Sequence, residues 1–286
     1  MGKQAVFSIK DGELGDGGFY LTTKAIFFDI DGTLINIMNQ RPQMTEPTRQ
    51  AILRLRQAGH RTFIASGRPL DYLDPELTEQ GLFDGYVLMN GAAVFVDGKC
   101  IYEQPLPEAQ VRDIIALCEQ QGIEYILQGA HHVYLRPEFT GLARFYQGIG
   151  IDVGRFVRTF APEEVDTCKM EFFAFEAEGG GAFHELLSLP GLTGLMDPYH
   201  KKNMELYAAD VTKGSGILHA LKYLGIPVQD SIAFGDGLND IEMMQTVGTA
   251  VAMGNAQPEV KAIARYTVPD VDADGAAWGI EHLILE

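Results

Sequence analysis

The chain has 286 residues, of which 46% are hydrophobic and 21% are charged, and its formal net charge is −17. This apolar content is enough for one large or two ordinary domains, and it excludes global disorder. The negative charge disfavours nucleic acids and anionic membranes as partners, because both bind positively charged surfaces. No apolar run reaches the roughly 18–20 residues that span a bilayer.

The cysteines and the N-terminus indicate the compartment. Cys100, Cys118 and Cys168 are far apart and form no Cys-x-x-Cys pair. This spacing argues against a disulfide framework or a zinc site and predicts a cytoplasmic protein in a reducing environment. The N-terminus lacks the basic-then-apolar pattern of a signal peptide. Residues 1–21 are glycine-rich without a hydrophobic period, so we expect an N-terminal extension outside the fold.

Strands and helices alternate after this extension. Residues 24–29 are apolar and predict a buried parallel strand. A helix is expected at 47–58 and a second strand at 61–65. A helix between two such strands is a βαβ unit, which predicts a parallel sheet. A third strand is expected at 86–89.

The rhythm changes between residues 92 and 205, where strands follow one another closely. The expected strands are 94–96, 100–103, 124–127, 132–135, 169–176 and 204–208, with helices at 108–121 and 182–187. Such a succession predicts a mixed or antiparallel sheet covered on one face, and therefore an inserted α+β domain at 92–205.

The alternation of strands and helices resumes after about residue 210. Helices are expected at 214–224, 240–246, 259–264 and 276–285, and strands at 231–234, 249–252 and 266–268. The predicted fold class is α/β: a Rossmann-like parallel-sheet core of residues 22–91 and 206–286, interrupted by the inserted α+β domain.

Two carboxylates, Asp29 and Asp31, lie where the first strand opens into a loop. In an open α/β sheet, ligands bind at the carboxyl ends of the strands. Two unpaired carboxylates there would repel each other and be costly to desolvate, and a divalent cation would relieve both problems. Taken alone, the segment also fits a strand that ends in an acidic turn.

Three later segments have the residue types of a phosphate or metal site. Ser66 and Gly67 end the second strand with a hydroxyl and an approachable backbone, which suit a phosphate oxygen. Lys213 begins a helix, where the positive partial charge disfavours a lysine unless an anion lies there. Asp236 and Asp240 supply the hard oxygen ligands that Mg²⁺ prefers. Each segment alone also has an ordinary structural interpretation.

Together and in this order, the segments resemble the four motifs of the haloacid-dehalogenase superfamily. The matching stretches are Asp-x-Asp-Gly-Thr at 29–33, Ser-Gly at 66–67, Lys-Gly at 213–214 and Gly-Asp with Asn-Asp at 235–240. The insertion between the second and third motifs, with Asn-Gly-Ala at 90–92, resembles the Cof-like sugar-phosphatase branch, which has a large α/β cap there. Asp-Gly-Ala at 274–276 matches that branch in part.

The resemblance implies roles for these residues. Asp29 would be the nucleophile that forms an aspartyl-phosphate, and Asp31 the general acid and base. Mg²⁺ would be held by the Asp29 side chain, the Asp31 carbonyl and Asp236. Phosphate-binding and supporting residues would be Ser66, Gly67, Lys213, Asn239 and Asp240. The implied enzyme is a magnesium-dependent phosphoric monoester hydrolase, monomeric or homodimeric, acting on a small sugar phosphate or cofactor phosphate.

Three alternatives stay open. Phosphomutases of the superfamily generally have a helical cap between the first two motifs, where this chain has only residues 34–65. Signalling receiver domains also use an aspartate, a hydroxyl and a lysine, but they are far shorter and have no counterpart of 235–240. A catalytically inactive phospho-ligand binding protein would retain the motifs without turnover. Phosphate release with Mg²⁺ distinguishes the phosphatase from both binding proteins.

The substrate itself is left open by the sequence. Arg68 and Asn90 border the predicted core site and either touch the substrate or stabilise loops. His131 and His132 are adjacent, and neighbouring strand residues face opposite sides, so at most one of them can point into a cleft.

Overall fold

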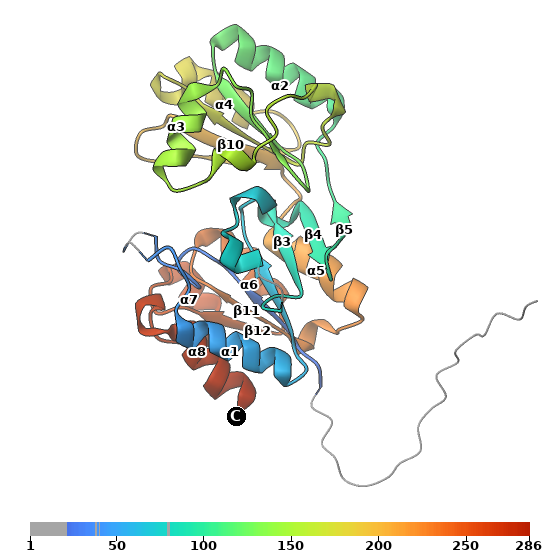
Figure 1. Cartoon of the computed structure of the whole chain (residues 1–286), viewed down its shortest axis with the longest axis vertical. Coiled ribbons are helices and arrows are strands. Elements are labelled where there is room, and N and C mark those ends of the chain that lie inside the picture. The colour runs from blue at the N-terminus through green and yellow to red at the C-terminus, as the bar shows by residue number, and fades with distance from the viewer. Residues whose placement is uncertain (1–21, 38, 40, 79–80) are drawn as a thin grey trace, which may run out of the picture.

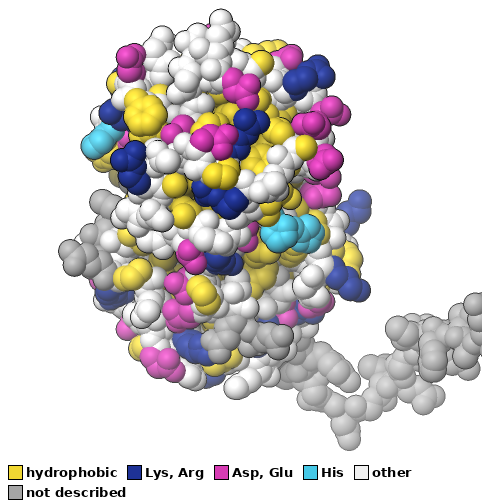
Figure 2. Space-filling view, turned by 45° about the horizontal axis from the view of Figure 1, so that its top comes forward, with side chains coloured by type: hydrophobic (Ala, Val, Ile, Leu, Met, Phe, Trp, Pro, Cys, Tyr) yellow, Lys and Arg dark blue, Asp and Glu magenta, His cyan; other side chains and the backbone are white. Residues whose placement is uncertain are grey.

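The structure is a computed structural model that describes residues 22–37, 39, 41–78 and 81–286. The expected extension at residues 1–21 lies outside this described part. The described residues form two lobes, each built on its own sheet (Figure 1). On the face seen in Figure 2, basic and acidic side chains are interspersed over both lobes. No helix of the described part is long and apolar enough to cross a membrane.

The first lobe is built on an eight-stranded sheet in the order β13-β12-β11-β1-β2-β3-β4-β5. All neighbours from β13 to β3 pair in parallel, which confirms the α/β class with a parallel-sheet core. The strand order reverses at β1, between β11 and β2. The bounds are β1 Ala25–Phe28, β2 Arg61–Ala65, β3 Gly85–Leu88, β4 Ala93–Val96, β5 Lys99–Glu103, β11 Ser231–Gly235, β12 Thr249–Ala252 and β13 Tyr266–Thr267.

Helices cover this sheet in two groups. Helix α1 packs against α8, whereas α5 packs against α6 and α6 against α7. Their bounds are α1 Glu46–Gln57, α5 Lys213–Leu224, α6 Ile241–Thr246, α7 Pro258–Ile263 and α8 Gly275–Ile280. All four residues of β1 are fully buried, as a central parallel strand requires. Thr212 and Ser215 form a capping box that begins α5 at Lys213.

The second lobe, residues 104–208, is built on a five-stranded antiparallel sheet in the order β7-β6-β8-β10-β9. Its strands are β6 Glu124–Gln128, β7 Val133–Tyr134, β8 Lys169–Phe173, β9 Leu192–Met196 and β10 Asn203–Ala208, and its helices are α2 Glu108–Gln121, α3 Thr140–Gly148 and α4 Ala182–Leu187. The sequence analysis missed α3 and β9. The carboxylate of Glu124 begins α3 by accepting hydrogen bonds from the amides of Gly141 (3.1 Å) and Leu142 (2.7 Å), a contact between distant residues.

The sheet pairing corrects the expected start of the inserted domain. Strands β4 and β5 form a hairpin that pairs with β3 in the core sheet, so the second sheet does not include them. The pattern of closely spaced strands begins at residue 93, but pairing depends on tertiary contacts that this pattern does not contain. The boundary at residue 92 is therefore twelve residues too early for the second lobe as its sheet defines it.

Candidate active site

The predicted strand-end residues meet at one edge of the core sheet. Asp29 directly follows β1, Ser66 follows β2 and Asp236 follows β11. These three strands are parallel neighbours with β1 in the middle, so their carboxyl ends open at the same edge. This edge is also the point where the strand order reverses, which is where open α/β sheets bind ligands.

Lys213 joins two of these carboxylates. Its Nζ donates to Asp29 Oδ1 at 2.5 Å and to Asp240 Oδ1 at 2.6 Å. The Lys213 side chain is fully buried, as is that of Asp240. A buried lysine at a helix N-terminus is unfavourable on its own, and the two carboxylates provide the negative charge that it needs.

Asp240 stabilises the loop after β11 in addition to binding Lys213. Its Oδ2 accepts hydrogen bonds from the amides of Asp236 and Gly237, both at 2.9 Å. Both oxygens of Asp240 are therefore engaged within the protein. Asp240 fixes the loop after β11 and orients Lys213.

Two residues that the sequence analysis did not single out hold Asp236. Thr33 Oγ1 donates to Asp236 Oδ1 at 3.2 Å, and Asn255 Nδ2 approaches Asp236 Oδ2 at 3.3 Å while donating to the Gly32 carbonyl at 2.8 Å. Gly32 has φ +86°, and a Cβ there would lie 2.2 Å from Asp236 Oδ2. Only glycine allows the first and fourth motif loops to approach this closely. Thr33 was visible as part of the first motif, whereas nothing in the sequence pattern marked Asn255.

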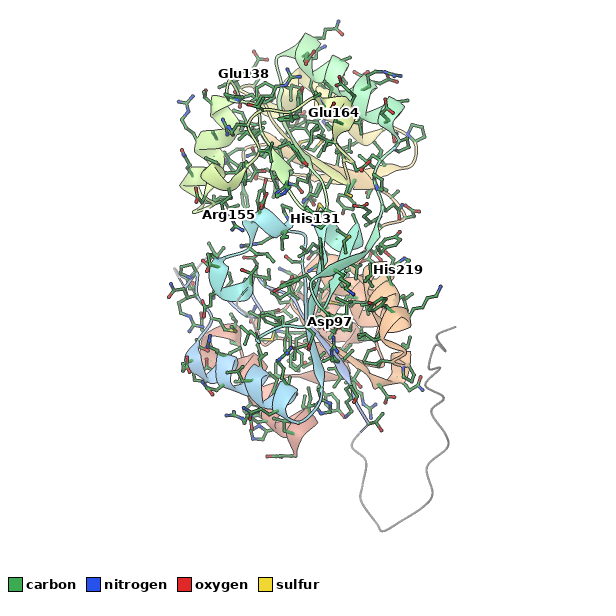
Figure 3. All side chains as sticks on the ribbon, turned by 45° about the vertical axis from the view of Figure 1, so that its right-hand side comes forward. Asp97, His131, Glu138, Arg155, Glu164 and His219 are labelled. Carbon is green, nitrogen blue, oxygen red and sulfur yellow. The ribbon has the colours of Figure 1, made fainter. Side chains whose placement is uncertain are left out.

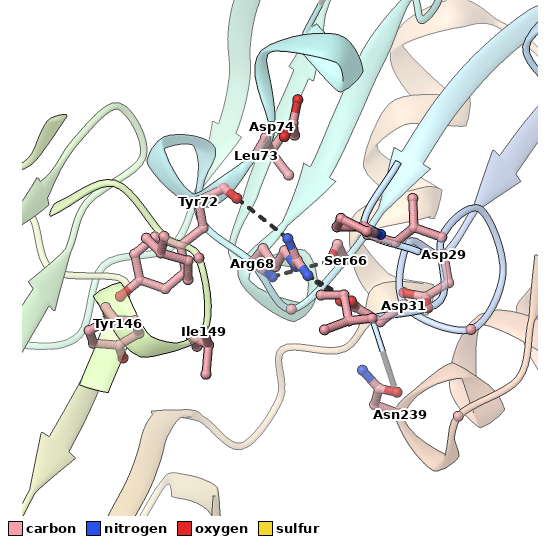
Figure 4. Close-up of a pocket in the computed structure, with 18 of the residues that line it drawn as sticks. Asp29, Asp31, Ser66, Arg68, Tyr72, Leu73, Asp74, Tyr146, Ile149 and Asn239 are labelled. Atoms are coloured by element: carbon pink, nitrogen blue, oxygen red, sulfur yellow. Dashed lines mark hydrogen bonds and ion pairs between the residues drawn. The ribbon is translucent and has the colours of Figure 1, made fainter. Parts of the chain in front are cut away.

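Asp31 is tied to Arg68. The guanidinium donates through Nε to Asp31 Oδ2 at 2.9 Å and through Nη2 to Asp31 Oδ1 at 2.6 Å, the two-point geometry of strong arginine–carboxylate pairs (Figure 4). The Arg68 amide also donates to Ser66 Oγ at 3.3 Å. The sequence left the role of Arg68 undecided, and the structure shows it as the partner of Asp31.

Three of the predicted phosphate-binding residues line a cavity between the two lobes, whereas the fully buried Lys213 is not among its lining residues. Ser66 and Gly67 border it from the end of β2, and Asn239 borders it from the opposite loop. Figure 4 shows Asp29, Asp31 and Ser66 close together, with Tyr146 and Ile149 of the second lobe facing them across the cavity. The cavity has a volume of about 1090 Å³ and is lined by both lobes.

The two histidines take no part in this site. His131 packs edge-on against the ring of Phe95, with ring centroids 5.4 Å apart, and Figure 3 shows it at the junction of the lobes. His132 Nδ1 lies 3.8 Å from the carboxylate of Asp71. Neither histidine lines the cavity.

Burial dominates the electrostatics of the site. It raises the pKa of Asp29 to about 8, against the opposing effect of Lys213, and it raises the pKa of Asp236 to about 7. Burial alone would lower the pKa of Lys213, but the carboxylates of Asp240 and Asp29 raise it above its ordinary value. Lys213 is therefore the fixed positive charge of the site.

The carboxylates fit a divalent cation. Ligand oxygens of Asp29, Asp236 and Asp240 lie within 4.8 Å of one another. Both oxygens of Asp240 are already engaged, so Asp29 and Asp236 are the better side-chain ligands. Four carboxylates face two cations here, since Asp31 pairs with Arg68 while Asp29 and Asp240 share Lys213. A bound cation would favour the ionised forms of Asp29 and Asp236 despite their burial. The two negative charges then left over equal the charge of one Mg²⁺, and hard oxygen donors are the ligands it prefers.

Comparisons with known proteins match the chain to one family. Residues 26–280 match the family described as haloacid dehalogenase-like hydrolase. YkrA of Bacillus subtilis (strain 168), which its name proposes as a phosphatase, is 32% identical over 93% of this chain and 99% of its own length. The pyridoxal phosphate phosphatase YbhA of Escherichia coli (strain K12) is 27% identical over 92% of this chain and 100% of its own.

A solved structure is similar over both lobes. The sugar phosphatase BT4131, described as a member of HAD subclass IIB, has a TM-score of 0.74 and 32% sequence identity. The alignment covers 91% of this chain and 98% of that one. The shared fold therefore includes the second lobe as well as the core.

Proposed function

Because the chain belongs to the haloacid dehalogenase-like hydrolases, we propose that it is a magnesium-dependent phosphatase that cleaves small phosphate monoesters through an aspartyl-phosphate on Asp29. Its membership and its neighbours confirm the predicted superfamily and the Cof-like branch. The names of its relatives also confirm the predicted enzyme class, a phosphoric monoester hydrolase. The substrate, the metal and the mechanism are proposals.

The observation that carries the proposal is the placement of Asp29. Its carboxylate lines the cavity, yet Asp29 is only 7% exposed and one of its oxygens is held by Lys213. The other oxygen would attack a phosphorus atom bound in the cavity. A carboxylate that attacks phosphorus forms an acyl phosphate, and water then cleaves it, which splits one difficult displacement into two easier ones.

Attack by a carboxylate on an anionic phosphoryl group requires positive charge nearby. Lys213 supplies one fixed charge, and Ser66 and Asn239 supply hydrogen-bond donors at the cavity wall. Asp29 and Asp236, with the Asp31 carbonyl, would hold Mg²⁺, which when bound neutralises charge on the phosphoryl oxygens.

Asp31 would protonate the leaving oxygen and then activate the water. In the structure its two carboxylate oxygens each accept a hydrogen bond from the Arg68 guanidinium. For the acid step the Arg68 contact must be released, so that a proton can reside on Asp31 and be donated. Arg68 would therefore hold Asp31 in place between turnovers, and substrate binding would have to break the contact between the two side chains.

We further propose that the second lobe acts as a cap over this site, with the cap defined as residues 104–208. Its strands β8, β9 and β10 contribute side chains to the cavity wall opposite Asp29. Two chain crossings join it to the core, after β5 and after β10, and such a connection permits a hinge. Closure would exclude water while the aspartyl-phosphate forms.

The substrate class follows from the size of the cavity and from the relatives. A cavity of about 1090 Å³ accommodates a small metabolite rather than a polymer. YbhA is named for pyridoxal phosphate, and YitU of Bacillus subtilis (strain 168), 27% identical, is named for 5-amino-6-(5-phospho-D-ribitylamino)uracil. Both are monophosphates of small metabolites, and we propose the same class for this chain.

The test is turnover of 4-nitrophenyl phosphate by the full chain and by Asp29→Asn. We expect phosphate release with Mg²⁺, abolition by EDTA, restoration by added Mg²⁺, and a loss of several orders of magnitude in Asp29→Asn. Asp113→Asn changes an exposed carboxylate of α2 outside the cavity and serves as the matched control. Near wild-type turnover by Asp29→Asn, or full activity after exhaustive chelation, would reject the nucleophile or the metal respectively.

A further inference from the structure

A short core segment that follows Ser66 is bound by the cap along its length. We call this segment, residues 67–73, the docking segment. Three of its oxygens accept hydrogen bonds from the cap: Asp71 Oδ2 from the Val133 amide at 2.8 Å, the Leu73 carbonyl from Arg155 Nη1 at 2.8 Å, and the Gly67 carbonyl from Lys169 Nζ at 3.1 Å. The two lobes therefore meet at the loop that carries the second motif.

The side chain of Tyr72 is inserted into the cap. Tyr72 is only 7% exposed, and its ring stacks on Phe156 with ring centroids 5.5 Å apart and lies 5.1 Å from the ring of Tyr146. Its hydroxyl accepts a hydrogen bond from Gln128 Nε2 at 3.3 Å and lies 3.4 Å from Glu171 Oε2. These residues belong to the cap, so a core side chain completes an aromatic cluster whose other members are all cap residues.

The docking segment also carries Arg68. Its guanidinium holds the Asp31 carboxylate through Nε and Nη2, and its Nη1 lies 3.5 Å from the Tyr72 carbonyl (Figure 4). The Met89 amide donates to the Arg68 carbonyl at 3.2 Å, so the Arg68 backbone stays with the core. The Arg68 side chain therefore lies between the proposed acid and base of the reaction and a carbonyl whose position is fixed by the cap.

The orientation of Asp31 depends on this arrangement. Its side chain is 49% exposed, and an exposed carboxylate has several rotamers open to it. A general acid must lie within hydrogen-bond reach of the leaving oxygen, so the two bonds from Arg68 select the useful rotamer before substrate binds. When substrate binding breaks these bonds, the Tyr72 carbonyl remains as an acceptor for the released guanidinium.

We propose that Tyr72 is a positioning residue for the acid–base step. Its ring anchors the docking segment in the cap, and the anchored segment holds Arg68 where it orients Asp31. Seating of the cap and orientation of Asp31 are then one event, because the cap binds the same segment that carries Arg68. This inference rests on the proposed phosphatase function and adds a residue that acts through Arg68 rather than on the substrate.

Two aryl phosphates that differ by one nitro group test the proposal with the Mg²⁺-loaded full chain. Phenol is a more basic leaving group than 4-nitrophenol, so turnover of phenyl phosphate depends more strongly on protonation by Asp31. Tyr72→Leu removes the ring and the hydroxyl. We expect it to raise the ratio of kcat/KM for 4-nitrophenyl phosphate over that for phenyl phosphate by at least about fivefold. An unchanged ratio would overturn the proposal.

Two changes in the cap separate the anchor from other effects. Phe156→Leu alters the cluster around Tyr72, and Phe156 does not line the cavity, so the ratio should rise as in Tyr72→Leu. This variant replaces Tyr72→Leu if the latter fails to fold. Phe183→Leu removes a comparably buried ring of the cap that lies outside both the Tyr72 cluster and the cavity, and it should leave the ratio unchanged. An equal rise in Phe183→Leu would attribute the effect to general loosening of the cap and overturn the proposal.

A double-mutant cycle tests whether Tyr72 acts through Arg68. Arg68→Ala alone should raise the ratio, because Asp31 loses its orienting partner. In the Arg68→Ala background, Tyr72→Leu should then change the ratio by less than about twofold, since the interaction that it disturbs is already absent. Equal effects of Tyr72→Leu in both backgrounds would show that Tyr72 acts independently of Arg68 and would overturn the proposal.

Amide hydrogen exchange measures the anchor without turnover. The Val133 amide donates to Asp71 across the lobes, whereas the Leu135 amide donates to the Val157 carbonyl within the cap at 3.1 Å. Tyr72→Leu should accelerate exchange at Val133 by at least about tenfold and leave exchange at Leu135 within about twofold of wild type. Unchanged exchange at Val133 would show that Tyr72 does not anchor the segment, which would overturn the proposal.

The outcomes distinguish this inference from the proposed function. Phosphate release from both aryl phosphates without the expected change of ratio would overturn the role of Tyr72 alone. Absence of phosphate release from either substrate in the wild-type chain would overturn the proposed function and this inference with it.

Discussion

Replacing Lys213 by methionine is the most informative single change in the site. Lys213→Met retains most of the side-chain volume and removes the positive charge that lies between Asp29 and Asp240. The Lys213 side chain is fully buried, and its Nζ lies 2.5 and 2.6 Å from the two carboxylate oxygens. The variant therefore leaves two buried carboxylates facing each other without a cation.

The expected loss of stability follows from these contacts. Removing one partner of a buried ion pair costs about 3–5 kcal/mol, which lowers the Tm of a chain of this size by about 6–20 °C. The effect should depend on pH. Without Lys213, the two facing carboxylates are relieved by protonation, so the loss of Tm should be smaller at about pH 5.5 than at about pH 8.5.

Thermal unfolding in EDTA measures this change without compensation by a bound cation. Lys222→Met, in the last turn of the same helix and exposed, is the matched control and should change Tm by less than about 2 °C. Turnover of 4-nitrophenyl phosphate should fall at least about 100-fold in Lys213→Met. A Tm within about 2 °C of wild type at both pH values would refute the reasoning, because no buried ion pair would then have been broken.

Two further changes test the neighbouring contacts. Burial and the Glu205 carboxylate raise the pKa of Glu171 to about 8, above its unfolded value, so its contribution to stability is present at low pH and is lost as pH rises toward 8. Between about pH 4.5 and 8, the unfolding free energy of the wild type should therefore fall more steeply than that of Glu171→Gln, by up to about 1.4 kcal/mol per pH unit. Denaturant titrations across this pH range measure the difference. An unchanged pH profile would contradict the assignment. Gly32→Ala should reduce turnover at least about tenfold, because the added Cβ would displace Asp236, a ligand of the proposed Mg²⁺. Gly59→Ala has a similar φ of +85° with open space around it, so equal loss in both variants would attribute the effect to backbone strain alone.

The sequence alone determined the core fold and the residues at its strand ends. Asp29, Ser66 and Asp236 each directly follow a short apolar strand, and parallel neighbours open at the same edge of a sheet. Local pattern was therefore sufficient to predict that these side chains meet, although no single segment was decisive. The position of Lys213 was predictable for a similar reason, since the helix that leads into the parallel strand β11 begins at the edge where the strands end.

Contacts between distant segments were decided only by the tertiary structure. The pairing of β4 and β5 with β3 depends on which sheet edge is free, and the helix α3 depends on Glu124, which begins it from a different strand. Arg68 and Asn255 reach Asp31 and Asp236 through side-chain geometry that no periodicity encodes. The pairing of Glu171 with Glu205 in the second lobe likewise arises from strand register, because hydrophobic patterning determines which face a residue occupies but does not determine its partner across the strand.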